Sequence, residues 1–234
     1  MVKNEINTIL KINKLFPRLL LLTAYCLLLT FGIAFADAQK SDGTPIKLNS
    51  YEALSKLLDG NKRFASGRHV QSKNLKQHPW AIVVACSDSM VAPEIIFDQG
   101  PGSIFAIRTA GNVLDPISVG SIEYAAKRLH TPLLIILGHD KCDVVKAAVE
   151  TKEISQDNIM ALVRKIVPAV KKAAAMGGSK EDILHNAIRE NILIQRKYLL
   201  RKSPVVNNLV GAGAIQIVTG IYNDESGEVE IIKQ

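Results

Sequence analysis

The stretch "AIVVACSDSMVAPEIIF", residues 81–97, decides the fold that we expect for this chain. Its first five residues, Ala81–Ala85, are all apolar rather than alternating with polar residues, and the run stops at a thiol, Cys86. Short, uniformly apolar runs of this kind are typical of parallel strands that are covered on both faces. Two further runs, Ile104–Ile107 and Leu133–Leu137, have the same character.

Helical patterns separate these apolar runs. A first helix is expected to begin with Ser50 as its cap, and "ISVGSIEYAAKRLH" lies between the second and third runs. A last apolar run continues into "YNDESGEVE", which predicts an edge hairpin that turns at Asp224–Gly227. Strands that alternate with helices predict a single α/β domain, with a central, mainly parallel β-sheet flanked by helices, over residues 50–234. Amphipathic stretches are expected at residues 143–150, 157–175 and 180–200.

The N-terminus has the pattern of an export signal over residues 1–36. A basic flank precedes "LLLLTAYCLLLTFGIAFA", which ends in Ala34–Ala36, the small-x-small pattern that signal peptidase requires. We therefore expect a cleaved signal peptide, a polar and flexible leader over residues 37–49, and an exported, periplasmic protein. The apolar run of 18 residues is also just long enough to span a bilayer, so a retained anchor is the alternative.

The charge of the chain does not indicate a nucleic-acid partner. The formal charge is +7, and it falls to +4 without residues 1–36, which hold four basic residues and one acidic residue. The sequence has no dense stripe of Lys and Arg interleaved with aromatic residues, so we expect no nucleic acid among its partners.

Beyond residue 36 the chain holds two cysteines, Cys86 and Cys142. In an oxidising compartment two thiols usually form a disulfide, unless a metal ion holds both. Cys86 follows the first predicted strand, and "LGHDKC" places His139 and Cys142 at the end of the third. A helix that begins near Asp140 would place these two residues about one turn apart.

Ligands of open α/β sheets bind beyond the carboxyl ends of the strands, where these three residues are expected to meet. One imidazole and two thiolates match a zinc site with three protein ligands and an open position. Structural zinc sites fill that fourth position with another Cys or His, so this donor set favours a catalytic site. A Cys86–Cys142 disulfide, and with it a two-thiol redox protein, is the competing hypothesis.

Several segments resemble the β-class carbonic anhydrases. They are "LLDGNKRF", "ACSDSMVAPEIIFDQGPGSIFAIRTAGN", "SIEYA" and "LGHDKC", and the likeness runs in consistent order from about Tyr51 to the C-terminus. The resemblance implies one Zn²⁺ per chain, held by Cys86, His139 and Cys142. It also implies reversible hydration of carbon dioxide to bicarbonate and a proton by a homodimer or a dimer of dimers, without membrane attachment after signal cleavage.

The resemblance assigns roles to two further residues. Asp88 would orient the nucleophile and, in a closed form of some members, would itself ligate zinc and expel the water. Gln77 would donate a hydrogen bond to bicarbonate from across the dimer.

The sequence departs from the family at Met90, because the family pattern is Cys-x-Asp-x-Arg and its Arg is missing here. In the family this Arg holds the Asp in a charge-assisted pair, away from the metal. Without it we expect Asp88 to prefer the metal, which predicts an enzyme that is impaired or gated by pH. The alternative is a zinc-binding pseudoenzyme that binds bicarbonate or a partner without turnover.

Overall fold

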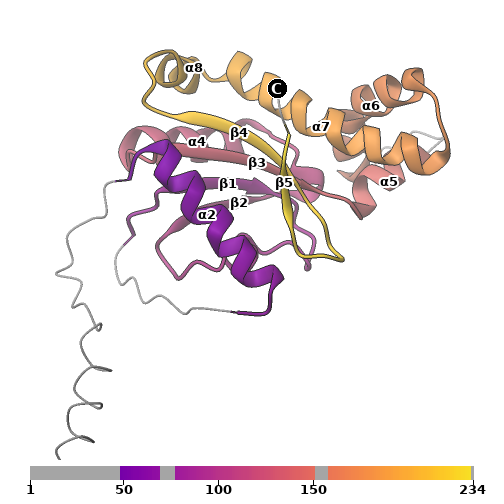
Figure 1. The fold of residues 1–234 in the computed structure, drawn as a ribbon. Helices are drawn as coiled ribbons and strands as arrows, with labels where there is room; N and C mark the ends of the chain where they lie inside the picture. The colour runs from indigo at the N-terminus through magenta and orange to yellow at the C-terminus, as the bar shows by residue number, and fades with distance from the viewer. Residues whose placement is uncertain (1–47, 69–76, 151–157, 233–234) are drawn as a thin grey trace, which may run out of the picture. The chain divides into compact units, whose positions relative to one another are not determined.

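The computed structural model describes residues 48–68, 77–150 and 158–232. Their centre is a five-stranded sheet of order β2-β1-β3-β4-β5 (Figure 1). The first four strands pair in parallel, and the last is antiparallel to its neighbour. The predicted α/β class with a mainly parallel sheet is therefore confirmed. The strands are β1 (Ala81–Ala85), β2 (Ile104–Arg108), β3 (Leu133–His139), β4 (Gln216–Tyr222) and β5 (Val229–Ile231).

Helices cover both faces of this sheet. In Figure 1, α2 lies in front of the strands, and α7 packs against β3 and β4. Helix α3 packs beside α2, and α4 packs beside α8. Among the described residues no helix is long and apolar enough to cross a membrane. The helices are α2 (Ser50–Ala65), α3 (Pro93–Ile96), α4 (Pro116–Arg128), α5 (Asp143–Glu150), α6 (Asn158–Met176), α7 (Lys180–Lys202) and α8 (Pro204–Gly211), with a short 3₁₀ turn η1 (Ala110–Asn112).

The N-terminal predictions fall largely outside the described residues. The proposed signal peptide and the leader up to residue 47 lie there, so both stay predictions. The first helix begins where expected, but its cap is Asn49 rather than Ser50. The Asn49 side chain accepts the amide of Glu52, whose carboxylate accepts the Asn49 amide in return. A capping box needs an acid or amide three residues after the cap, which Asn49 has in Glu52.

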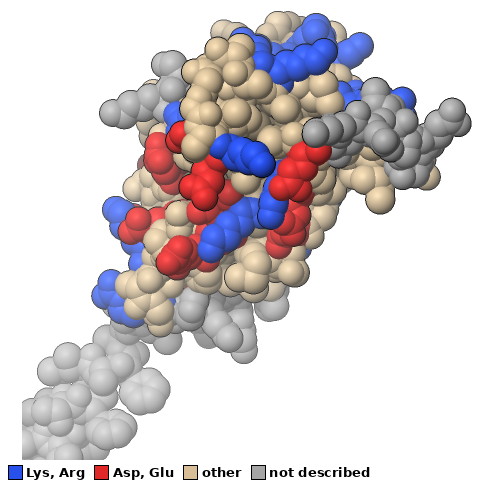
Figure 2. All heavy atoms as spheres, turned by 90° about the vertical axis from the view of Figure 1, so that its right-hand side faces the viewer, with Lys and Arg blue, Asp and Glu red and all other residues tan. Residues whose placement is uncertain are grey.

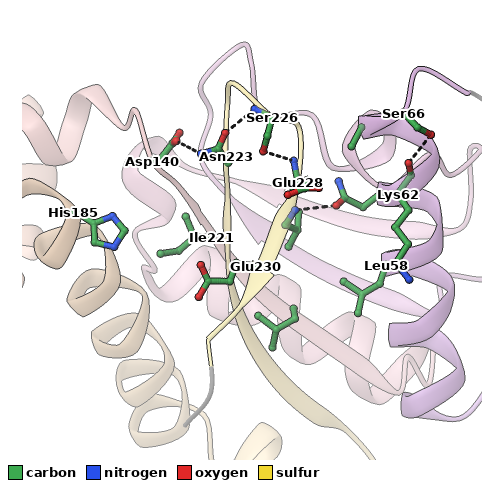
Figure 3. A pocket seen from close by; sticks show the side chains of 14 residues that line it. Leu58, Lys62, Ser66, Asp140, His185, Ile221, Asn223, Ser226, Glu228 and Glu230 are labelled. Carbon is green, nitrogen blue, oxygen red and sulfur yellow. Dashed lines mark hydrogen bonds between the residues drawn. The ribbon is translucent and has the colours of Figure 1, made fainter.

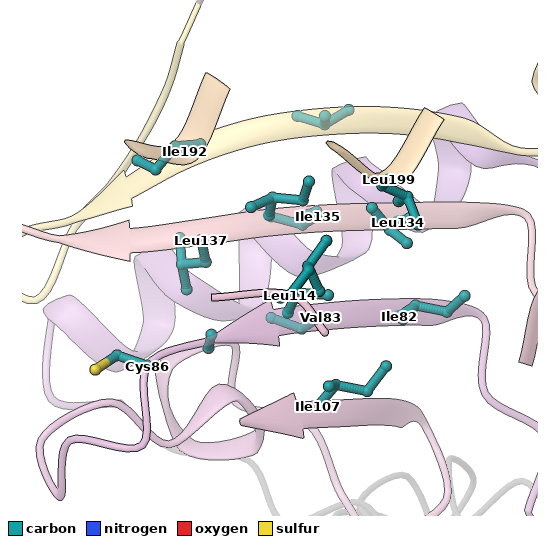
Figure 4. Packing of buried hydrophobic residues seen from close by; sticks show 14 of the residues in the cluster. Ile82, Val83, Cys86, Ile107, Leu114, Leu134, Ile135, Leu137, Ile192 and Leu199 are labelled. Carbon is teal, nitrogen blue, oxygen red and sulfur yellow. The ribbon is translucent and has the colours of Figure 1, made fainter. Parts of the chain in front are cut away.

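The centre of the core is the pair β1 and β3, as their uniform apolar character predicted. Every residue of β1 and of Leu133–Leu137 is fully buried. Figure 4 shows Leu137 of β3 and Ile192 of α7 near the end of the sheet that carries Cys86. Leu134 of β3 and Leu199 of α7 lie toward the other end. At Gly138 a Cβ atom would lie 2.6 Å from Ile192, so this glycine allows α7 to pack closely beside the end of β3.

A buried amide of α2 ties the edge hairpin to the rest of the domain. The Nδ2 atom of Asn61 donates to the carbonyls of Ile96, at 3.0 Å, and Gly227, at 2.7 Å. Its Oδ1 atom accepts the amide of Val229 at 2.9 Å. Because Asn61 is only 4% exposed, these three bonds form away from solvent and fix the turn that leads into β5.

We predict that Asn61→Leu lowers the free energy of unfolding by about 3 kcal/mol, because buried backbone groups without a partner cost about 1–3 kcal/mol each. Urea denaturation measures the change. Asp59→Ala, at an exposed position of the same helix, is the control and should change stability by less than about 0.5 kcal/mol. Equal stability of the two variants would contradict the role of Asn61.

Candidate metal centre

Three potential metal ligands meet where β1 and β3 end. From β1 the chain crosses to β2 on one side and then returns to β3 on the other, so the ends of β1 and β3 flank the point where the strand order reverses. Cys86 directly follows β1, His139 is the last residue of β3, and Cys142 directly precedes α5. Their ligand atoms all lie within 4.8 Å of one another, and all three residues are buried. Both cysteines are free thiols in this structure.

Helix α5 begins at Asp143, so the expected helix start near Asp140 is wrong. The carboxylate of Asp140 accepts the Asn223 side-chain amide at 2.8 Å and the Asp224 backbone amide at 3.0 Å. These bonds attach Asp140 to the hairpin between β4 and β5. His139 consequently stays in the strand, and only Cys142 lies at the helix start.

The imidazole of His139 is oriented by a carboxylate. Its Nδ1 atom lies 2.9 Å from Oδ2 of Asp224, and the two side chains are only 1% and 7% exposed. Within the described residues the buried Nε2 atom has no hydrogen-bond partner. A carboxylate on one ring nitrogen fixes the tautomer and leaves the other nitrogen to bind a metal. The unpaired Nε2 atom, close to two thiols, therefore fits a metal ion, and the donor set suits zinc.

The three groups shift one another's pKa values. The neighbouring Cys142 thiol lowers the pKa of Cys86, whereas Cys86 and burial raise the pKa of Cys142. Burial lowers the pKa of His139, but the Cys86 sulfur and the Asp224 carboxylate together raise it more, to about 9. Of the three groups, the Cys86 thiol thus ionises most readily, and metal binding to such groups requires their deprotonated form.

Backbone amides also point at the Cys86 sulfur. The amides of Asp88 and Gly111 donate to Sγ at 3.4 Å and 3.3 Å. Gly111 belongs to η1, which follows β2 in the chain. Its φ of 65° lies in the left-handed region that favours glycine. Such bonds stabilise a thiolate in a buried site.

Asp88 lies beside the cluster but outside the group of three ligands. Its Oδ1 atom accepts the backbone amide of Met90 at 2.9 Å, so a backbone donor holds the carboxylate that Arg would hold in the family. Arg108 donates to the carbonyls of Cys86 and Asp88, at 3.2 Å and 2.6 Å, and so holds the loop rather than the carboxylate. The ligation of zinc by Asp88 stays a prediction.

Gln77 lies in an exposed position before β1. The adjacent amides of His78 and Trp80 bond to Gly102 and Ser103, which precede β2. Gln77 is thus at the amino end of the strand whose carboxyl end carries Cys86. Within one chain it does not join the ligand cluster, and its proposed role requires a second copy.

Sequence reasoning missed the contribution of Asp224, which it placed only at the start of a turn. β4 pairs in parallel with β3, so both strands end at the same edge of the sheet. An acidic residue two positions beyond β4 is therefore close to the end of β3. The position of Asp224 near His139 could have been predicted from the sequence if the pairing of β3 with β4 had been known.

A groove of about 780 Å³ lies behind the hairpin and is separate from the ligand cluster. Figure 3 shows Lys62 on the side of α2, Glu228 and Glu230 on the hairpin, and His185 on the opposite side. Acidic and basic side chains are mixed on the face that Figure 2 presents. Asp140 lines this groove while its carboxylate holds the hairpin that carries Asp224.

Comparison with known proteins agrees with this geometry. The family model described as carbonic anhydrase matches residues 81–229. The chain belongs to the β-carbonic anhydrase family. A carbonic anhydrase of Mycolicibacterium smegmatis is 35% identical over 195 residues, which cover 78% of this chain and 93% of that protein. Carbonic anhydrase 2 of Mycobacterium tuberculosis is 34% identical, over 76% of this chain and 91% of that protein.

Solved structures agree as well. The β-carbonic anhydrase CcaA has a TM-score of 0.60 at 27% identity, covering 67% of this chain and 81% of that chain. The β-carbonic anhydrase CafA of Aspergillus fumigatus has a TM-score of 0.62 at 25% identity, covering 67% and 76%. This β-carbonic anhydrase is therefore an enzyme of the class that hydrates carbon dioxide.

We predict that Asp224→Ala weakens zinc binding about 10- to 100-fold, because loss of a carboxylate behind a ligating histidine typically has that effect. Competition with a chelator of known affinity measures the dissociation constant. Glu225→Gln, at the exposed neighbouring position, should bind zinc as tightly as the unmodified chain. Tight binding by Asp224→Ala would show that His139 needs no such partner.

Proposed function

We propose that this carbonic anhydrase is an exported zinc enzyme that interconverts carbon dioxide and bicarbonate. One observation carries the proposal: two thiols and an imidazole with an unpaired Nε2 atom meet within 4.8 Å at the edge of a parallel sheet. Among the described residues no fourth Cys or His joins the set, which is the pattern of a catalytic zinc site with an open position. Export rests on the sequence pattern of residues 1–36.

Cys86, His139 and Cys142 would hold one zinc ion per chain. Bound there, zinc would acidify water and so supply the nucleophile for carbon dioxide. Asp224 holds the Nδ1 side of His139 and would so keep the Nε2 atom free to ligate the ion. Asp88 would orient the attacking water by accepting its hydrogen bond.

A second copy of the chain would complete the site by contributing Gln77, which would donate to bicarbonate. We propose a homodimer or a dimer of dimers. Two β-carbonic anhydrases of Sordaria macrospora that share this fold are described as tetrameric. Large apolar side chains on the surface of one chain, Ile117 at 78% and Tyr124 at 52% exposure, are consistent with a covered face.

Met90 would set the level of activity. Its backbone amide holds one oxygen of Asp88, but a neutral donor is weaker than the charged pair that the family uses. Asp88 would then spend more time on the open position of the metal, where it excludes the attacking water. Activity would rise with pH, as hydroxide competes better for that position. The second candidate function is a zinc-binding pseudoenzyme, in which Asp88 would stay bound to the metal at every pH.

We expect Cys86→Ser and Cys142→Ser each to abolish stoichiometric zinc and to lower the melting temperature, because metal binding is coupled to folding. Metal analysis and calorimetry on the purified variants measure both effects. Ser87→Ala, at the exposed position beside Cys86, should keep full zinc content. Zinc at the level of the unmodified chain in either Cys variant would remove this assignment.

Met90→Arg should raise activity at neutral pH about tenfold. A charge-assisted hydrogen bond exceeds a neutral one by roughly 1–1.5 kcal/mol, and 1.4 kcal/mol is about tenfold in a population. The Met90 side chain is 61% exposed, so an arginine has room. Hydration rates measured from neutral to alkaline pH test the change. Ser89→Arg adds the same charge one residue away and should leave the pH profile unchanged, whereas an equal gain in both variants would contradict a specific pair with Asp88.

A further inference from the structure

Two buried amide side chains of α7 connect this helix to the metal centre. We propose that Asn191 and Gln195 are positioning residues for the ligand Cys86, an inference that rests on the metal centre proposed above. The two side chains are 1% and 2% exposed. They lie one helical turn apart, among residues of α7 that are otherwise mostly apolar where buried.

An unbroken series of hydrogen bonds runs from α7 to the Cys86 sulfur. Gln195 accepts the Leu114 backbone amide at 3.0 Å and donates through Nε2 to Oδ1 of Asn191 at 3.0 Å. Asn191 donates through Nδ2 to the Gly111 carbonyl at 2.8 Å. The Gly111 amide in turn donates to Sγ of Cys86 at 3.3 Å. The series thus fixes Gly111 through its carbonyl, and this orients the Gly111 amide toward the Cys86 sulfur.

The loop would not keep this conformation without support. Gly111 and Asn112 have φ values of 65° and 47°, a region that is uncommon for residues other than glycine and that Asn enters more readily than most. A Cβ atom on Gly111 would lie 2.9 Å from the Ile166 side chain. Backbone in such conformations persists only where its surroundings hold it, and it concentrates at functional sites. Here the two amides of α7 hold the loop, together with the Thr109 hydroxyl, which donates to the Val113 carbonyl at 2.7 Å.

The chemistry of the site explains why polar groups are used at this place. Leucine or methionine could fill the same volume without the cost of burying an amide. An N–H bond to a thiolate draws charge from the sulfur, and hydrogen bonds of this kind tune metal–sulfur sites. Two thiolates together cancel the charge of a divalent ion, so weaker donation from Cys86 would leave the ion a better Lewis acid. The α7 amides would therefore set the donor strength of one of the two sulfurs.

The test uses the chain loaded with Co²⁺, whose sulfur-to-metal charge-transfer absorption reports the donor strength of the thiolates. Asn191→Leu should move this band to longer wavelength, because the sulfur electrons are bound less tightly when the Gly111 amide is no longer held. Zinc affinity should fall about tenfold. Gln195→Met should give a smaller shift in the same direction, because the bond from Asn191 to Gly111 can persist without it.

Leu199→Ala is the matched control, since Leu199 is a buried residue of the same helix that lies toward the other end of the sheet from Cys86 (Figure 4). It should lose stability without moving the band. An unmoved band in Asn191→Leu and Gln195→Met, or an equal shift in Leu199→Ala, would overturn the proposal. If Asn191→Leu does not fold, Gln195→Met decides alone. Failure of the unmodified chain to bind Co²⁺ would instead remove the metal centre itself.

Discussion

The parallel pairing of β1 with β3 is the constraint on which the rest of the structure depends. Parallel strands end at the same edge of a sheet, and these two lie where the strand order reverses. A residue just beyond one strand is therefore brought to a residue at the end of the other, although more than fifty positions separate Cys86 from His139. The full burial of both strands makes their register costly to change.

The hydrophobic core brings the ends of these two strands together, and buried hydrogen bonds then orient the side chains of His139 and Cys86. The β4–β5 hairpin brings Asp224 to His139, and Asp140 with Asn61 holds the hairpin itself. At Cys86, Asn191 of α7 donates to the Gly111 carbonyl, and the Gly111 amide donates to the Cys86 sulfur. The two residues of each contact are far apart in the sequence. The arrangement of the three candidate ligands thus depends on residues from both ends of the domain.

The sequence predicted those parts of the molecule that depend on local pattern. The strands β1 and β3 follow from uniform apolar runs, and the candidate ligands Cys86, His139 and Cys142 from their place at strand ends. Asp224 and Asn191 were not predicted, because their roles arise from strand order and helix packing rather than from neighbouring residues. The helix start near Asp140 was wrong for a related reason, since Asp140 bonds to a hairpin more than eighty residues later.

The central claim is that zinc at this cluster makes the chain a working carbonic anhydrase. The most direct measurement is stopped-flow hydration of carbon dioxide across pH, with zinc content determined on the same sample before chelation, after chelation and after zinc is restored. We predict hydration that requires about one zinc per chain, is low near neutral pH and rises under alkaline conditions. A sample that contains full zinc but is inactive at every pH, or one that is equally active after zinc is removed, would contradict the account.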